Sequence, residues 1–155
     1  MDSFSIFAAE YLYIISVAVL GVYFFLQSRS SWKRMALFAI LAGLFAFALG
    51  MITNHVYFDP RPFVVGHFTP LIPHAPDNGF PSDHALLVSA VAMIGTLWNR
   101  RLGVALWILA LLVAIGRVYV GLHHVLDVAG SIVISSVAVL LTYAAYKYLF
   151  HKEIA

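Results

Sequence analysis

Apolar residues fill most of the chain and gather into five stretches separated by short polar segments. A helix needs about 20 mostly apolar residues to cross a hydrocarbon core of about 30 Å. The stretches predict membrane-spanning helices at residues 4–27, 33–57, 82–98, 102–120 and 125–148. The stretch at 82–98 is the shortest and lies near the lower limit for a span, so either a full or a partial crossing fits it. We therefore expect an all-α, polytopic transmembrane bundle of about five helices.

All six prolines lie within residues 60–81, between the second and third predicted helices. The dipeptide Asn78-Gly79 falls in the same segment. Proline and glycine at this density interrupt helices, and irregular backbone near a membrane lies at the surface or lines a polar cavity. The segment is therefore predicted to be an extracytoplasmic loop that caps one end of the bundle.

The composition supports a membrane protein and excludes several other classes. Of the 155 residues, 63% are hydrophobic and 10% are charged, which is far outside the usual range of soluble proteins. This length predicts a single membrane-embedded domain over residues 1–155. The chain has no cysteine, so disulfides, thiolate nucleophiles and cysteine-based metal sites are excluded. It also lacks a basic stripe, which excludes nucleic acid as a partner.

Charged residues near the helix ends predict the orientation, because lysine and arginine are retained on the cytoplasmic side. Basic residues follow the first, third and fifth predicted helices: Arg29, Lys33, Arg34, Arg100, Arg101, Lys147 and Lys152. Acidic residues occupy the opposite ends: Asp2, Glu10, Asp59, Asp77, Asp83 and Asp127. The first stretch lacks a basic leader and is long enough to span, so we expect a first helix with its N-terminus outside.

Three polar clusters interrupt the apolar chain, and all three fall on the predicted outer face. They are Arg61-Pro62, the tetrad Pro81-Ser82-Asp83-His84, and a segment that carries Arg117, His123 and Asp127. Ionisable side chains within membrane-spanning sequence are costly, so their presence indicates function. Arginine and histidine together indicate a phosphate ligand.

His123 and Asp127 are four residues apart, which places both on one face if the last helix begins near His123. An aspartate bonded to one ring nitrogen fixes the tautomer and leaves the other nitrogen available as a nucleophile. Arg117 is then expected to hold the phosphoryl oxygens. This segment predicts nucleophilic catalysis by histidine.

The tetrad that begins at Pro81 predicts the start of a helix. Free N–H groups and the helix dipole bind anions at such a position. Ser82 is expected to donate a hydrogen bond to phosphate, and His84 to protonate a leaving oxygen. Arg61 adds a bidentate donor. Phosphoryl transfer depends largely on positioning and on stabilising charge, which these groups supply.

These residues resemble the three signatures of the type-2 phosphatidic-acid phosphatase superfamily, K-x6-R-P, P-S-G-H and S-R-x5-H-x3-D. The matching residues, in order, are Arg61 and Pro62, then Pro81, Ser82 and His84, then Arg117, His123 and Asp127. Segments 56–63, 71–75 and 80–84 further resemble the bacitracin-resistance branch of undecaprenyl-pyrophosphate phosphatases. The resemblance implies a bacterial inner-membrane enzyme that converts undecaprenyl pyrophosphate to undecaprenyl phosphate and phosphate, recycling the carrier lipid for peptidoglycan synthesis.

The resemblance also implies a role for each matched residue, without a metal or another cofactor. His123 would attack phosphorus and form a phosphohistidine, oriented by Asp127. His84 would be the general acid for the leaving group. The remaining matched residues would bind the phosphate: Arg61, Ser82 and Arg117.

Three positions depart from the family signatures. Asn54, Asp83 and Gly116 stand where the signatures have lysine, glycine and serine. Asn54 removes a cation and can contact phosphate only by hydrogen bonding. The carboxylate of Asp83 favours the helix dipole but repels a pyrophosphate, so we expect it to face away, bind a loop donor or accompany a cation. His74, in the loop, is a further candidate for substrate binding.

Two alternatives stay open. The same constellation serves any lipid phosphate, so phosphatidylglycerophosphate or phosphatidic acid is an alternative substrate. A transporter or binding protein, in which histidines and acids relay protons or hold a metal, is the second. Arg61 and Arg117 would repel a metal cation, and no cysteine is present to bind one, which disfavours it. The sequence gives no indication of the oligomeric state.

Overall fold

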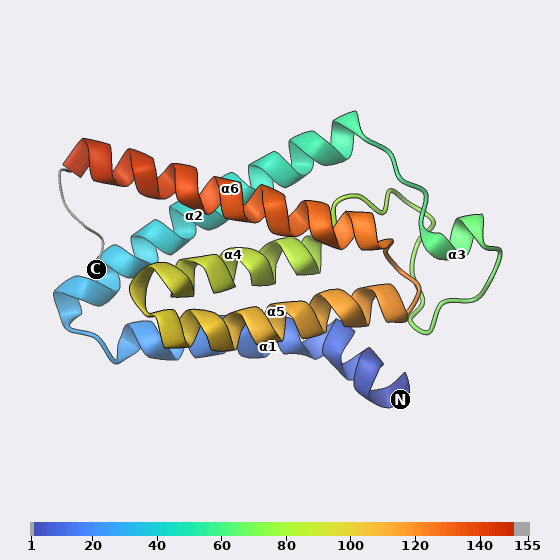
Figure 1. Cartoon of the computed structure of the whole chain (residues 1–155), viewed down its shortest axis with the longest axis horizontal. Helices are drawn as coiled ribbons and strands as arrows, with labels where there is room; N and C mark the ends of the chain where they lie inside the picture. The colour runs from blue at the N-terminus through green and yellow to red at the C-terminus, as the bar shows by residue number, and fades with distance from the viewer. Residues whose placement is uncertain (1, 151–155) are drawn as a thin grey trace.

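A computed structural model describes residues 2–150, which form six helices and no strand (Figure 1). Five helices run along the bundle: α1 (Asp2–Phe25), α2 (Arg29–Val56), α4 (Asp83–Trp98), α5 (Arg100–Tyr119) and α6 (Val125–Phe150). The sixth, α3 (Pro62–Val65), is a single turn within the proline-rich loop. The predicted all-α bundle with a loop at one end is confirmed.

Four of the five predicted spans are long and apolar enough to cross a membrane, and they correspond to α1, α2, α5 and α6. The helix predicted at 82–98 is present as α4, but its 16 residues are short for a span. The structure therefore has four helices of spanning length and one shorter apolar helix, for which the sequence left either a full or a partial crossing open.

The short helix α4 lies in the middle of the bundle, where it packs against α1, α2, α5 and α6 (Figure 1). Consecutive residues from Val88 to Ala92 are all buried, so the middle of the helix is covered on every side. A helix that is apolar all round is stable only when neighbours surround it. This central packing places the first turn of α4, with Asp83 and His84, in the middle of one end of the bundle.

The long helices bury one face and expose the other. In α2 the buried positions recur every three or four residues: Met35, Phe38, Ala42, Ala46 and Gly50. Large apolar side chains cover the opposite face of α2, among them Leu37, Ile40 and Leu44. Apolar surface of this extent marks contact with a membrane or a partner rather than with water. The outer face is therefore suited to lipid.

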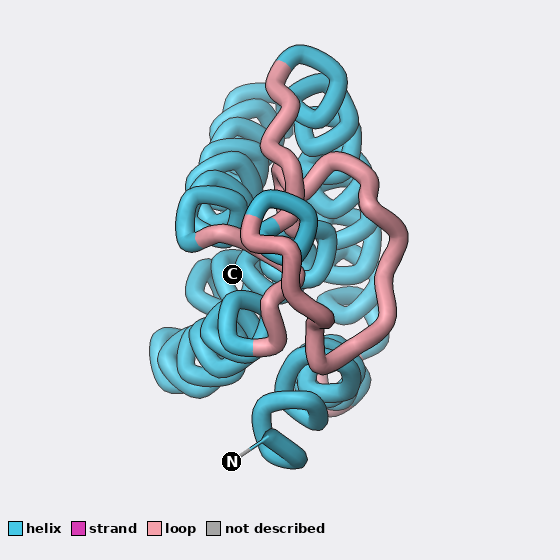
Figure 2. The backbone as a smooth tube through the Cα atoms, turned by 90° about the vertical axis from the view of Figure 1, so that its right-hand side faces the viewer, coloured by secondary structure: helices cyan, strands magenta, loops and turns pink. Residues whose placement is uncertain are grey.

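The two ends of the bundle differ. The α1–α2 and α4–α5 connections lie at the left of Figure 1, together with the last turn of α6, and carry Arg29, Arg100 and Lys147. Lys152, also expected at this end, lies outside the described residues. At the other end, the loop crosses over the start of α4 and the α5–α6 connection, as the end-on view shows (Figure 2). The three polar clusters therefore converge on the loop end.

One side chain, Asn78, ties the loop to the end of α2. Its Oδ1 accepts hydrogen bonds from the backbone N–H groups of Asp59 and Phe80, at 2.9 and 3.0 Å. Its Nδ2 donates to the carbonyls of Asn54 and Tyr57, at 2.9 and 2.8 Å. Asn54 Nδ2 in turn donates to the carbonyl of Phe80 at 2.8 Å. These bonds fix the backbone on both sides of the cavity described next.

Candidate active site

A polar cavity of about 160 Å³ opens at the loop end of the bundle. Its lining comes from α2, the loop, α4, α5 and the α5–α6 connection: Asn54, Arg61, His74, Asp77, Asn78, Pro81, Asp83, His84, Arg117 and His123. Every site residue proposed from the sequence lines this cavity except Ser82 and Asp127. Residues that lie far apart in the chain therefore meet here.

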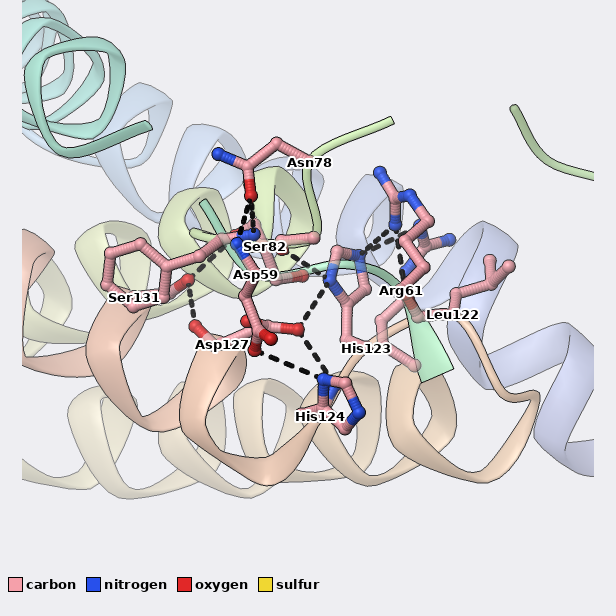
Figure 3. A network of polar contacts seen from close by, with 12 residues as sticks. Asp59, Arg61, Asn78, Ser82, Leu122, His123, His124, Asp127 and Ser131 are labelled. Atoms are coloured by element: carbon pink, nitrogen blue, oxygen red, sulfur yellow. Dashed lines mark hydrogen bonds and ion pairs between the residues drawn. The ribbon is translucent and has the colours of Figure 1, made fainter. Parts of the chain in front are cut away.

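His123 is 3% exposed and lies in the turn before α6. Its Nδ1 is 2.9 Å from the carbonyl oxygen of Gly79. Because a carbonyl can only accept, Nδ1 carries the proton and Nε2 keeps a free lone pair. Asp127 Oδ2 lies 3.5 Å from the same Nδ1 (Figure 3). The Gly79 carbonyl therefore makes the shorter contact to Nδ1, while Asp127 adds a negative charge beside it.

Gly121 allows the chain to place His123 in this position. It follows the end of α5 and has a φ of +82°, in the left-handed region that glycine adopts without strain. A side chain at Gly121 would also meet the ring of Phe68 in the loop. The last helix begins at Val125, as the stretch at 125–148 predicted, so His123 lies two residues before its start. The turn, rather than a shared helix face, brings His123 and Asp127 together.

Two guanidinium groups flank the unprotonated nitrogen of His123. Arg61 Nη1 and Arg117 Nη2 lie 3.3 and 3.4 Å from Nε2, and both arginines are buried. Arg61 is held by two further contacts, from Nη1 to the carbonyl of Leu122 at 2.9 Å and from Nε to the carboxylate of Asp77. Two positive charges beside a neutral nucleophile form a binding site for an anion.

The surroundings of His123 and Asp77 shift their pKa values. Burial lowers the pKa of His123, and the charges of Arg117 and Arg61 lower it further, which together outweigh the contact with Asp127. His123 therefore stays neutral to lower pH than an exposed histidine. Burial raises the pKa of Asp77, but the hydrogen bond and charge of Arg61 outweigh it and leave the pKa below its usual value. Asp77 therefore stays ionised and keeps Arg61 in place.

Two other histidines also line the cavity. His84 is in the first turn of α4, and its ring packs edge-on against Tyr13 with 4.9 Å between ring centroids. His74 is in the loop, with Nδ1 3.7 Å from Asp77 Oδ1. Asp83, the residue before His84, is exposed and also lines an apolar groove next to the cavity. Of these, His84 shares the polar cavity with His123, and its role as a proton donor stays a prediction.

Ser82 and Asn54 were both expected to contact phosphate, but neither side chain is seen in a position that shows this. Ser82 precedes the first residue of α4 and is fully buried, and its hydroxyl has no hydrogen-bond partner among the described residues. It does not line the cavity, so phosphate binding by this hydroxyl stays a prediction. Asn54 lines the cavity, but its amide already donates to the Phe80 carbonyl. Its observed contact is therefore with the loop.

Sequence reasoning missed the loop residues that hold the site together. Asp77 pairs with Arg61, and Gly79 bonds to His123. A Cβ atom at Gly79 would lie 3.1 Å from Asp127 Oδ2, so the close approach favours glycine. The available signals were the turn-forming pair of Asn78 with Gly79 and the clustering of acids in the loop. Neither signal shows that Asp77 pairs with Arg61 or that Gly79 bonds to His123.

A second polar group lies behind His123 and consists of Asp59, His124 and Asp127 (Figure 3). His124 Nδ1 is 3.1 Å from Asp59 Oδ2, and the backbone N–H of His124 donates to Asp127 Oδ2 at 2.7 Å. Among the described residues, these side chains bring metal-type ligand atoms within 4.8 Å of one another. In the structure these residues contact one another through hydrogen bonds.

Known proteins are similar to this chain in sequence. The profile of the PAP2 superfamily matches residues 32–151. Undecaprenyl-diphosphatase BcrC of Bacillus subtilis (strain 168) is 35% identical over 135 residues, covering 87% of this chain and 69% of that protein. The bacitracin transport permease protein BcrC of Bacillus licheniformis is 30% identical over 138 residues, covering 88% of this chain and 68% of that protein.

A solved structure shows the same fold. The transmembrane PAP2 type phosphatidylglycerolphosphate phosphatase from Bacillus subtilis matches with a TM-score of 0.66, covering 95% of this chain and 84% of that chain at 20% identity. The superfamily match extends over most of the chain and includes all three polar clusters. The chain therefore belongs to the PAP2 superfamily and is a membrane phosphatase.

Proposed function

We propose that this phosphatase removes the terminal phosphate of undecaprenyl diphosphate, releasing undecaprenyl phosphate and inorganic phosphate and so recycling a carrier lipid. The observation that carries the proposal is the position of His123 Nε2, unprotonated and flanked by the guanidinium groups of Arg61 and Arg117. The name of the 35% identical relative, undecaprenyl-diphosphatase, supports this choice of substrate.

In the first step, the lone pair on His123 Nε2 attacks the terminal phosphorus and forms an N–P bond. The P–O bond to undecaprenyl phosphate breaks, and its electron pair goes to the leaving oxygen, which takes a proton from His84. The guanidinium groups of Arg61 and Arg117 stabilise the charge on the equatorial oxygens. Asp127 stabilises the imidazole ring as it becomes positively charged. The product is a phosphohistidine.

In the second step, water attacks the phosphorus of the phosphohistidine. His84, now neutral, accepts a proton from this water, and the N–P bond breaks so that its electron pair returns to His123. Phosphate leaves, and both histidines return to their starting states. Because Arg61 and Arg117 supply the positive charge that phosphoryl transfer needs, we propose a reaction that requires no metal or other cofactor.

An apolar groove beside the cavity supports a lipid substrate. It lies between α2 and α4, has a volume of about 280 Å³, and is lined by Gly43, Ala46, Phe47, Asp83, Leu86, Leu87 and Ala90. A second hollow next to it is lined in part by Asn54 and Asp83, which also line the polar cavity. The groove and the cavity therefore adjoin each other at Asp83, and we place the prenyl chain in the groove.

Filling the groove is expected to weaken binding of the long prenyl chain. A Cβ atom at Gly43 meets no atom within 4 Å, and Gly43 lines the groove, so the side chain of Gly43→Leu is expected to occupy part of the groove. Displacing about two methylene groups of the lipid costs about 1.6 kcal/mol, so KM for undecaprenyl diphosphate should rise about tenfold. The measurement is KM for undecaprenyl diphosphate and for a short prenyl diphosphate that does not reach Gly43.

A matched control is Gly21→Leu, because Gly21 in α1 is equally open and does not line the groove. It should leave both KM values unchanged. Equal increases in KM for the long and short substrates in Gly43→Leu would contradict the placement of the prenyl chain.

We propose that the loop end faces the extracytoplasmic side of a bacterial inner membrane. The support is the set of basic residues at the opposite end, since such residues are retained in the cytoplasm. The chain has no cysteine, so a single cysteine can report the side. In intact cells, Thr69→Cys in the exposed loop should react with a membrane-impermeant maleimide, and Ser30→Cys at the basic end should react only after permeabilisation. The reverse pattern would overturn the orientation.

Phosphate release by the purified protein tests the substrate. With a chelator present, undecaprenyl diphosphate should be hydrolysed in preference to phosphatidylglycerophosphate and phosphatidic acid. A preference for either glycerophospholipid would assign the enzyme to phospholipid metabolism, the alternative that the same chemistry allows. Loss of activity on adding the chelator would contradict the metal-independent reaction.

The name of the Bacillus licheniformis relative describes a transport permease, which corresponds to the second alternative from the sequence. A transporter has no need of an N–P bond. If His123→Ala keeps substrate binding and loses phosphate release, the transporter is excluded. If the wild-type protein binds the lipid and releases no phosphate, the hydrolase proposal fails.

A further inference from the structure

Two carboxyl groups meet behind the nucleophile. Asp59 lies between α2 and α3, and Asp127 lies in the first turn of α6. One carboxylate oxygen of each and a ring nitrogen of His124 all lie within 4.8 Å of one another. Asp127 is fully buried, and the Asp59 side chain is 18% exposed. Two ionised carboxylates this close repel each other strongly, so such pairs retain one proton between them.

The surrounding hydrogen bonds indicate where that proton lies. Asp127 Oδ2 accepts from the backbone N–H of His124 at 2.7 Å, and Asp59 Oδ2 lies 3.1 Å from His124 Nδ1. Asp127 Oδ1 is buried and has no donor among the described groups. Buried acceptors in folded proteins are almost always paired. Because a carboxylate oxygen of Asp59 lies within 4.8 Å of one of Asp127, a proton on Asp59 would offer Asp127 a donor.

We propose that Asp59 is a positioning residue, whose protonated carboxyl group donates a hydrogen bond to Asp127 Oδ1 and holds Asp127 as a single negative charge beside His123. The inference rests on the proposed phosphohistidine chemistry. Asp59 acts through Asp127 and does not touch the substrate.

The backbone of the loop holds Asp59 firmly enough for this role. Its N–H donates to Asn78 Oδ1 at 2.9 Å, and its carbonyl accepts from the N–H of Gly79 at 2.8 Å. Gly79 is also the residue whose carbonyl contacts His123 Nδ1. The same short segment therefore positions the ring of the nucleophile and the partner of Asp127.

The charged groups around Asp59 favour its protonated form. Burial raises the pKa of Asp59 and the neighbouring Asp127 raises it further, while His124 opposes them. The guanidinium groups of Arg61 and Arg117 are directed at His123, and Arg61 is also paired with Asp77. As pH rises through the pKa of Asp59, the pair gains a second negative charge and Asp127 loses its donor. Turnover should then fall.

The experiment compares Asp59→Asn with Asp59→Ala in wild-type background across the pH range. The asparagine amide offers an N–H donor that cannot titrate, so kcat at the optimum should stay within about threefold of wild type, and the alkaline loss of activity due to Asp59 should disappear. Alanine leaves Asp127 Oδ1 unpaired, so kcat should fall about tenfold or more with KM little changed. Asp2→Asn, an Asp-to-Asn change at the exposed N-terminal end of α1, should alter neither quantity.

Equal losses in Asp59→Asn and Asp59→Ala with an unchanged pH profile would overturn the proposal. A divalent-cation requirement that both variants abolish would also overturn it, because the pair would then hold a cation instead of a proton. Infrared spectroscopy tests the proton without any turnover. The carbonyl band of a protonated carboxylic acid should be present at neutral pH in wild type and absent in Asp59→Asn. If wild type releases no phosphate, only the proposed function fails, and this band still decides the inference.

Discussion

Replacing His123 with alanine is expected to abolish phosphate release, lowering kcat by at least about 10⁴-fold, because the atom that would bond to phosphorus is lost. The neighbouring His124 does not replace it, since its Nδ1 contacts Asp59 and it does not line the cavity. The measurement is kcat on undecaprenyl diphosphate, together with trapping of labelled phosphate on the protein. Wild type should form an acid-labile phosphoprotein, and His123→Ala should not.

Asp127→Asn should be less severe, with kcat lowered by about 10²-fold. The Gly79 carbonyl, at 2.9 Å, still holds Nδ1–H when the aspartate at 3.5 Å loses its charge. Retained substrate binding and an unchanged circular dichroism spectrum would control for misfolding in both variants. Equal losses in the two variants would contradict a purely orienting and charge-stabilising role for Asp127.

The second large effect is expected for Arg61→Lys, which should lower kcat/KM by about 10²-fold or more. Arg61 uses one planar group to contact Leu122, Asp77 and His123 at once. A lysine ammonium keeps the charge but has a single nitrogen on a flexible stem, so it cannot reproduce this set of contacts. The measurement is kcat/KM on the diphosphate, with the thermal midpoint recorded to separate instability from lost catalysis.

Arg100→Lys is the matched control, because Arg100 is exposed at the opposite end of the bundle, and it should leave kcat/KM unchanged. Near-normal activity in Arg61→Lys would show that a point charge is sufficient and that the planar geometry of Arg61 is not needed.

The helices and the polar clusters were predictable because each depends on residues that are close together in the sequence. Apolar stretches of spanning length gave four helices, and the density of prolines gave the loop. The alternation of basic and acidic connections correctly predicted that Arg61, His84 and His123 meet at one end. These inferences need only the length and order of segments.

The contacts that hold the site were not predictable in the same way, because they depend on how the loop folds back. The spacing of four residues indicated that Asp127 orients His123, yet the shorter contact to Nδ1 comes from the carbonyl of Gly79. Every residue has a backbone carbonyl, so the sequence does not show which one will accept this hydrogen bond. Similarly, the buried hydroxyl of Ser82 is set by the packing around the start of α4, which the motif does not encode.

The loop ties involving Asn78 have a practical consequence for handling the protein in detergent. The apolar helices can stay helical in a micelle while the loop detaches, since each helix forms its backbone hydrogen bonds within itself. Arg61 reaches His123 only when the loop is in place. A helical circular dichroism spectrum or a symmetrical gel-filtration peak therefore does not show that the active site is intact after extraction. Phosphate release shows this directly.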